Sequence, residues 1–195
     1  VEETVGANNT WTVGDGVTAT LVKEGNKDVL YFDSKRGTLW NNWYVELGNS
    51  ARIVDMIKFS ESSTVMYLPE NSTKLFGDEW GSKFPTLEEI VLDKVDTSNV
   101  KDMSYMFSAS DVVLFSPENL DLSSVTDMSH MFENCNSLQG VLLPENVNSN
   151  HLTDISFMFK GCQSLEGLDI ESLNTNQVES MAGTFQDCSY LSSID

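Results

Sequence analysis

The sequence predicts an α/β solenoid, in which stacked repeats of one strand and one short helix each form a continuous core. Two observations predict this fold: a pattern that recurs four times, and a change of hydrophobic period within each copy. The four copies read VKDMSYMF, VTDMSHMF, LTDISFMF and VESMAGTF, and they begin at Val100, Val125, Leu152 and Val178. They end at steps of 25, 27 and 26 residues, on Phe107, Phe132, Phe159 and Phe185.

The first part of each copy predicts a short amphipathic helix. Apolar residues stand at offsets 0, 3, 6 and 7, which share one arc of a helix that turns about 100° per residue. Asn99 with Asp102, and Ser124 with Asp127, resemble a polar cap followed by an acid in the first helical turn. We expect the methionines of these copies to face the core rather than a metal: Met103, Met106, Met128, Met131, Met158 and Met181.

The second part of each copy predicts a strand. It reads L-x-x-L-x-I, and its last two apolar residues alternate with the period of two that a strand requires. The clearest examples begin at Leu87, Leu138 and Leu165. The copy after Phe107 is shorter and irregular, because Val113 is followed by Ser116 where an apolar residue is expected. One strand and one short helix in 25–27 residues lie within the range of leucine-rich repeats.

Residues 1–50 have a different pattern and predict a β-rich N-terminal cap. Short strands are expected at 11–13, 17–22 and 29–32, with turns at 14–16 and 24–27. The solenoid is then expected over residues 51–195, degenerate over 51–86, regular over 87–195 and truncated at the C-terminus. The triplet Pro-Glu-Asn, which occurs at Pro69, Pro117 and Pro144, favours degenerate repeats before residue 87.

The charge excludes some classes of partner. The formal net charge is −19, and residues 84–195 alone carry 18 acidic against 3 basic residues. Such a surface repels phosphate backbones and anionic membrane surfaces, so we expect no nucleic-acid partner. No apolar run approaches the roughly 20 residues that span a bilayer. The acidic surface serves solubility alone, or it favours a cationic partner or bound cations.

Few residues suggest chemistry. The cysteines lie 27 and 26 residues apart, which is not a metal-ligand spacing, at Cys135, Cys162 and Cys188. They share one core position, so buried free thiols are expected, although a disulfide between neighbouring turns stays open. The two histidines, His130 and His151, belong to no recognisable triad. We therefore predict no catalytic residues and no enzyme.

Three aspartates recur at one position and form a predicted carboxylate column. Asp102, Asp127 and Asp154 either stabilise helix starts or bind calcium, which would offset the repulsion between stacked charges. The helix-start interpretation is favoured, and no calcium loop of the EF-hand type is present. We predict no resident cofactor and no metal site, with calcium as the one open alternative.

The run DTSNVKDMSYMF from Asp96 to Phe107, with the later FENCNSL and FKGCQSLEGLDI, resembles BspA-like leucine-rich-repeat surface proteins of bacteria. The resemblance covers roughly residues 84–195, and Trp11 and the Trp40-x-x-Trp43 pair are similar to the N-terminal β region of that family. It implies an extracellular or cell-surface bacterial protein, and some members are adhesins for host matrix proteins such as fibronectin or fibrinogen. It implies no catalytic motif.

These observations favour a non-catalytic, adhesin-type protein-binding module that uses the outward side of its strands. The residues expected on that face are Glu89, Val91, Asp93, Leu142, Asp169 and Glu171. One alternative is a structural spacer that projects another domain. Another is a carbohydrate-binding module that uses Trp40 and Trp43. Because the last strand begins at Leu191 and no closing element follows it, we also expect self-association through an uncapped C-terminal end.

Overall fold

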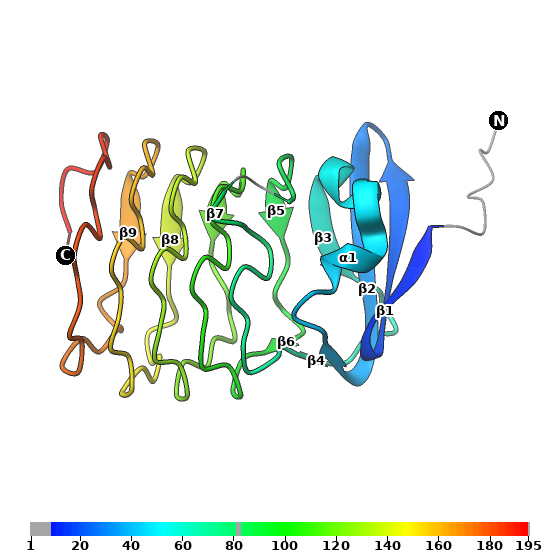
Figure 1. The fold of residues 1–195 in the computed structure, drawn as a ribbon, viewed down its shortest axis with the longest axis horizontal. Coiled ribbons are helices and arrows are strands. Elements are labelled where there is room, and N and C mark those ends of the chain that lie inside the picture. Colours follow the sequence, from blue (N-terminus) through cyan, green and yellow to red (C-terminus); the bar gives the residue numbers. More distant parts are fainter. Residues whose placement is uncertain (1–8, 81–82, 195) are drawn as a thin grey trace.

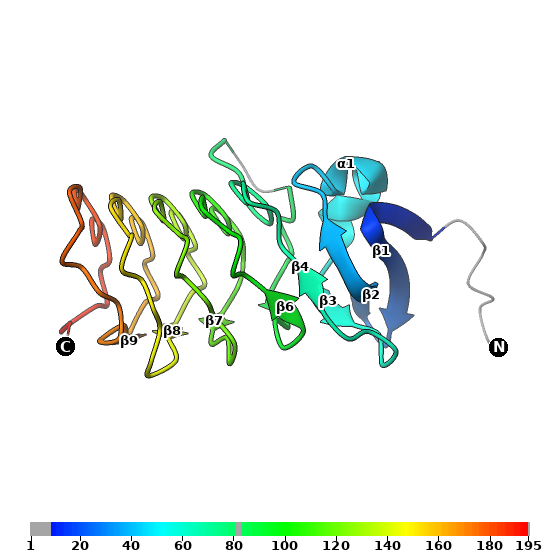
Figure 2. The same ribbon diagram turned by 90° about the horizontal axis from the view of Figure 1, so that it is seen from below.

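The computed structural model describes residues 9–80 and 83–194 and has the form of a solenoid of about five turns (Figures 1 and 2). A β-hairpin lies at the end where the described chain begins, and residue 194 lies at the opposite end. The predicted solenoid is confirmed, but the predicted helix in each repeat is wrong. In the described part of the chain, helix is restricted to α1 (Tyr44–Leu47) and the 3₁₀-helix η1 (Gly48–Ile53), both before the repeats.

The hairpin consists of β1 (Thr10–Glu24) and β2 (Lys27–Leu39), which pair in antiparallel fashion around a turn at Gly25. The turn expected at residues 14–16 is instead a β-bulge within β1, because the register shifts between Asp15 and Val17. A side chain at Gly14 would place its Cβ only 2.3 Å from the carbonyl oxygen of Thr38, so the strands approach too closely there for any residue but glycine.

Strand β2 also provides the first edge on which the solenoid stacks. It pairs in parallel with β3 (Met56–Phe59) and with β4 (Met66–Tyr67). In turn, β3 pairs with β5 (Glu89–Ile90), and β4 pairs with β6 (Val95–Asp96). The hairpin and the first turns therefore share one sheet, with the strand order β5-β3-β2-β4-β6 and β1 beside β2.

A second, separate sheet continues the stack. It contains β7 (Leu114–Phe115), β8 (Gly140–Leu142) and β9 (Gly167–Asp169), all parallel and one turn apart. Figure 1 shows β5, β7, β8 and β9 along one side of the solenoid. The strand layer is thus divided between β5 and β7, and this division positions the candidate site described below.

A ladder of tight turns replaces the predicted helices. We call it the turn ladder, and it comprises residues 102–110, 127–135, 154–162 and 180–188. In the first three copies, every second backbone N–H donates to a carbonyl of the next turn, as from Met103 to Asp127 at 2.9 Å and from Phe107 to Met131 at 2.9 Å. Most of the intervening N–H groups donate to the carbonyl three residues back, as from Met106 to Met103 at 3.2 Å, and the first of them donates to an aspartate side chain, as from Ser104 to Asp102 at 2.8 Å. Hydrogen bonds between repeats thus take the place of those within a helix.

Two positions in each turn of the ladder have a backbone that no α-helix allows. In the second copy they are His130, with a φ of 57°, and Asn134, with a φ of 59°. The equivalent positive-φ residues in the other copies are Tyr105 and Ala109, Phe157 and Gly161, and Gly183 and Asp187. A helix of eight residues is also marginal in water. Hydrogen bonds to the neighbouring turn therefore satisfy these backbone N–H and C=O groups better than a short helix would.

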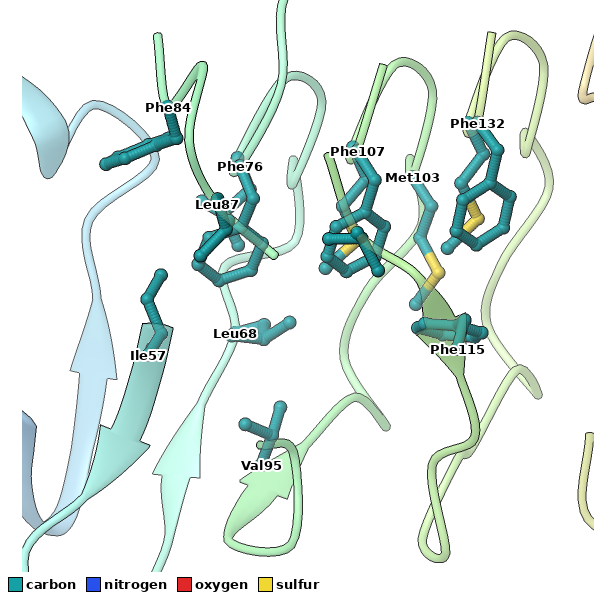
Figure 3. Packing of buried hydrophobic residues seen from close by; sticks show 14 of the residues in the cluster. Ile57, Leu68, Phe76, Phe84, Leu87, Val95, Met103, Phe107, Phe115 and Phe132 are labelled. Carbon is teal, nitrogen blue, oxygen red and sulfur yellow. The ribbon is translucent and has the colours of Figure 1, made fainter. Parts of the chain in front are cut away.

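The core nevertheless contains the residues that the helical pattern predicted. In the second copy the residues at offsets 0, 3, 6 and 7 are almost fully buried. Phenylalanines from successive turns stack with ring centroids 5.5–5.7 Å apart, in the column Phe76, Phe107, Phe132, Phe159 and Phe185. Figure 3 shows the first part of this column beside Met103 and Phe115. Five of the six methionines are buried as predicted, whereas Met181 is 54% exposed.

Candidate protein-binding groove

The residues predicted on the outward strand face lie at the surface, but in two groups. Around β5, Glu89 and Asp93 are exposed and Val91 is partly exposed. On or just beyond β8 and β9, the residues Leu142, Asp169 and Glu171 are exposed. Strand β7 lies between the two groups, and the structure does not bring them into one cluster.

The frame of β7 differs from the frame expected for the irregular copy. Leu114 pairs with Gly140 and Phe115 with Val141, which places Val112, rather than Val113, in the core column of Leu138. Val112 is fully buried, whereas Val113 is 37% exposed. This copy is one residue shorter than the next, and the missing residue falls just after Ser110. The core residue Val112 follows Ser110 by two positions, whereas Leu138 follows the equivalent Cys135 by three.

The strand layer opens between β5 and β7. In the described residues, one backbone hydrogen bond joins segments 88–93 and 113–118, from the N–H of Val113 to the carbonyl of Glu88 at 3.2 Å. By contrast, β8 and β9 pair over three residues, and the N–H of Leu143 then donates to Asp169 at 3.0 Å.

A groove of about 530 Å³ occupies this opening, and we call it the β5–β7 groove. Residues 88–93 form one wall and residues 113–118 form the other. Apolar side chains contribute to both walls, including Ile90, Leu92, Leu114, Phe115 and Pro117. Leu114 is 53% exposed, which is unusual for a leucine and leaves apolar surface available for contact.

The charged residues of the β5–β7 groove are all acidic: Glu88, Glu89, Asp93 and Glu118. Glu88 forms an ion pair with Lys27 at 2.6 Å. Across the described residues, no ion pair or side-chain hydrogen bond engages Glu89, Asp93 or Glu118, so these carboxylates are free to meet a cation. Asp93 and Glu118 also belong to a second depression of about 530 Å³, which continues the surface toward Asp96 and Asp121.

Sequence reasoning missed the β7 side of this groove, namely Leu114, Ser116 and Glu118. The frame that starts at Val113 assigned Ser116 to the core and made the copy appear merely irregular. The detectable signal was a second frame, Val112-x-x-Phe115-x-Pro117, which has the same spacing as Leu138-x-x-Val141-x-Leu143. It places Leu114, Ser116 and Glu118 outward.

The tryptophans proposed for sugar binding do not form an exposed platform. Trp43 is fully buried, donates from Nε1 to the carbonyl of Leu75 at 3.0 Å and stacks on Phe84 at 5.1 Å. Trp40 is half-buried, and its Nε1 donates to Asp15 at 3.2 Å. The side chain of Trp43 therefore contributes to the core of the N-terminal region rather than to a ligand surface.

The aspartate column exists, but the favoured interpretation, in which the carboxylates stabilise helix starts, is wrong. Asp102, Asp127 and Asp154 are neighbours in a run of β-bridges, and each accepts a hydrogen bond at 2.8 Å from the N–H two residues ahead. This is an Asx turn, so the carboxylates stabilise turns and not helix starts. Within residues 9–80 and 83–194, no group of three or more His, Cys, Asp or Glu side chains could hold a metal ion.

His130, Cys135 and Cys162 occupy packed positions, whereas His151 is exposed and Cys188 is partly exposed. The ring of His130 lies between those of Tyr105, at 4.4 Å, and Phe157, at 5.0 Å, and its Nδ1 is 2.6 Å from Glu133. His151 forms a hydrogen bond to the carbonyl of Ser123. All three cysteines are free, and burial raises the pKa of Cys135 to about 12, far above the range of a reactive thiol.

Comparison with known proteins identifies one family. Residues 112–194, somewhat less than half of the chain, match the model of a family described as Mycoplasma protein of unknown function, DUF285. The matched region begins at the buried Val112 and includes β7, β8 and β9. Neither the curated proteins nor the solved structures gave a match. None of the helices in the described residues is long and apolar enough to cross a membrane.

Proposed function

We propose that this chain is a non-catalytic protein-binding module that contacts its partner with the outward strand face of the solenoid. The observation that carries the proposal is the β5–β7 groove, where exposed apolar side chains and carboxylates without partners lie side by side. Protein interfaces commonly combine an apolar centre with a polar rim. The groove offers both on the face that a solenoid uses for recognition.

Further features of the face support the same proposal. Leu142 in β8 is 42% exposed, and the exposed acids Asp169 and Glu171 lie on or just beyond the neighbouring strand β9. Cys135, Cys162 and His130 are packed against other residues, which favours binding over catalysis. The partner that suits this surface is a protein with exposed basic residues.

The cellular setting is part of the proposal. We place the module at the surface of a bacterium, or outside it, as a BspA-like adhesin that contacts host matrix proteins. This rests on the resemblance of residues 84–195 to BspA-like repeats and on the match of residues 112–194 to a family of Mycoplasma proteins. It is a family-level argument.

The test is binding to immobilised fibronectin, fibrinogen, collagen and mucin at physiological salt, with and without calcium. The strand-face variant combines Asp169→Lys with Glu171→Lys. A control variant of equal charge change combines Asp111→Lys with Glu179→Lys, which replaces two exposed acids elsewhere. We expect saturable binding to at least one of these proteins, weakened about tenfold by the strand-face variant and not by the control. Equal loss in both variants, or no binding by the unmodified chain, would overturn the proposal.

A further inference from the structure

We propose that the β5–β7 groove binds an extended, cationic peptide segment of a protein partner, which inserts as an additional strand between β5 and β7. This inference rests on the proposed function and names the chemistry of the partner. It combines three independent features of the groove: open strand edges, apolar walls, and carboxylates that face outward. Strand addition of this kind obtains its affinity from backbone hydrogen bonds and its specificity from alternate side chains.

The first feature is the pair of strand edges. On the side away from the groove, β5 pairs with β3 and β7 pairs with β8. Both strands therefore already have extended backbones in a sheet. Between them the described residues have the single hydrogen bond from Val113 to Glu88, after which the two segments lie unpaired. An open strand edge is a template for another strand. Beyond that bond, residues 89–93 and 114–118 form the open part of the two walls, and five extended residues reach about 17 Å.

The second feature is the apolar interior of the opening. An inserted strand directs alternate side chains toward the core, where Leu92, Phe115 and Pro117 lie. These three residues also line a small cavity whose other walls include Met103 and Met131. That cavity holds only about 10 Å³, so an aliphatic side chain of the peptide enters it by displacing these methionines, whose side chains adapt readily to a neighbour's shape.

The third feature is charge. The other side chains of an inserted strand point outward. On that side the exposed carboxylates are Glu89 and Asp93 on one wall of the groove and Glu118 on the other. Opposite charges on neighbouring strands stabilise a sheet, and like charges destabilise it. Because no basic residue lines the groove, a peptide that alternates lysine or arginine with aliphatic residues is complementary to it on both sides.

The experiment uses the whole chain and a blocked six-residue probe peptide of alternating lysine and valine, measured by isothermal titration calorimetry at low and physiological salt. Three peptides serve as controls: alternating glutamate and valine, alternating lysine and glycine, and the lysine-valine peptide N-methylated at every second residue. N-methylation removes backbone donors while leaving the charge unchanged. We expect saturable 1:1 binding of the lysine-valine peptide, at least tenfold weaker binding of the glycine and methylated peptides, and none of the acidic peptide.

Variants of the chain locate the site. Glu89→Lys combined with Glu118→Lys is expected to weaken binding at least tenfold, and Ser116→Trp is expected to block the groove without changing its charge. The control combines Glu166→Lys with Glu179→Lys, two exposed acids outside the groove, and should bind as the unmodified chain does. Circular dichroism confirms that each variant is folded.

The outcomes separate this inference from the proposed function. Binding that survives Ser116→Trp, or that the methylated peptide reproduces, would overturn strand insertion and show only attraction between charges. If a matrix protein binds and Asp169→Lys with Glu171→Lys weakens it, while the groove variants do not, the strand face is functional and the groove inference is wrong. If the peptide binds in the groove but no matrix protein binds, the inference holds and the choice of host partner is wrong.

Discussion

The thiol of Cys135 donates a hydrogen bond to the carbonyl oxygen of Phe107 in the preceding turn, with 3.1 Å between sulfur and oxygen. The same contact recurs from Cys162 to Phe132 and from Cys188 to Phe159, both at 3.0 Å. Each of these carbonyls also accepts the backbone N–H three residues ahead in its own turn, so the thiol adds a second hydrogen bond that links neighbouring turns beside the phenylalanine column. The cysteines therefore contribute to the packing between turns rather than to chemical reactivity.

The three thiols are expected to differ in reactivity toward 5,5′-dithiobis(2-nitrobenzoate) at pH 8. Cys188 is partly exposed and should react first, whereas Cys135 and Cys162 are buried and should react only when the chain unfolds. Burial raises the pKa of Cys135 to about 12, so almost no thiolate forms in the folded state. A Cys188→Ser variant should show no fast phase, and rapid labelling of Cys135 in the folded chain would contradict this packing.

The same burial predicts a loss of stability at alkaline pH. The folded-state pKa of Cys135 lies above the unfolded value of roughly 8.5, so its contribution is complete below that value and declines as the pH rises toward 12. The decline approaches about 1.4 kcal/mol per pH unit once the unfolded thiol is ionised. Urea titrations between pH 8 and 10.5 should therefore show the advantage of the unmodified chain over Cys135→Ser shrinking. An advantage that stays constant or grows would contradict the prediction.

Much of the fold followed from the sequence because the four copies repeat at a nearly constant step. Burial at offsets 0, 3, 6 and 7 was predicted correctly for the first three copies, whereas Met181 of the fourth copy is exposed. The helix was predicted wrongly because offsets alone do not distinguish an α-helix from a run of linked turns. The distinction lies in the φ angles of residues such as His130 and Asn134, and in hydrogen bonds to other repeats, neither of which a single copy reveals.

The candidate site was predicted only in part, and for a specific reason. Glu89 and Asp93 were placed outward correctly from the period of two in their own strand. The groove beside them depends on a one-residue deletion after Ser110 and on the switch from one sheet to another between β5 and β7. Such a switch depends on how neighbouring turns pair, which a single copy does not reveal. Leu114 could be assigned to the groove only once the register of β7 against β8 was known.

The centre of the phenylalanine column is expected to contribute more stability than its end. Phe132 is fully buried, and its ring stacks on Phe107 at 5.5 Å and on Phe159 at 5.6 Å. Phe132→Ala should lower the free energy of unfolding by about 3–5 kcal/mol. Phe185 is partly buried and stacks on Phe159 alone in the described chain, so Phe185→Ala should cost roughly half as much. Urea denaturation of both variants checks this order, and equal losses would contradict it.

The aspartate column can be tested by separating the hydrogen bond from the charge. Asp127 accepts from the N–H of Ser129, and it lies between Asp102 and Asp154 in the run of bridges. Asp127→Asn keeps the acceptor and removes one like charge, so we expect stability unchanged or raised by a few tenths of a kcal/mol, more at low salt. Asp127→Ala loses the acceptor and should cost about 1 kcal/mol.

Calcium provides the contrasting measurement for the same column. Because the carboxylates of the column already accept backbone hydrogen bonds, we expect the thermal midpoint of unfolding to be the same with calcium and with a chelator. A midpoint that rises with calcium in the unmodified chain, but not in Asp127→Asn, would show that the column binds the ion instead.

The register of β7 decides both the core and the groove, and two neighbouring valines test it. Val112 is fully buried, and Val113 is 37% exposed beside the β5–β7 groove. Val112→Ser should lower the free energy of unfolding by roughly 2–3 kcal/mol, since it removes apolar contacts and buries a hydroxyl. Val113→Ser should change it by less than about 0.5 kcal/mol. Urea denaturation distinguishes the two registers, because the frame that starts at Val113 requires the larger loss at Val113 and would turn Leu114 and Glu118 away from the groove.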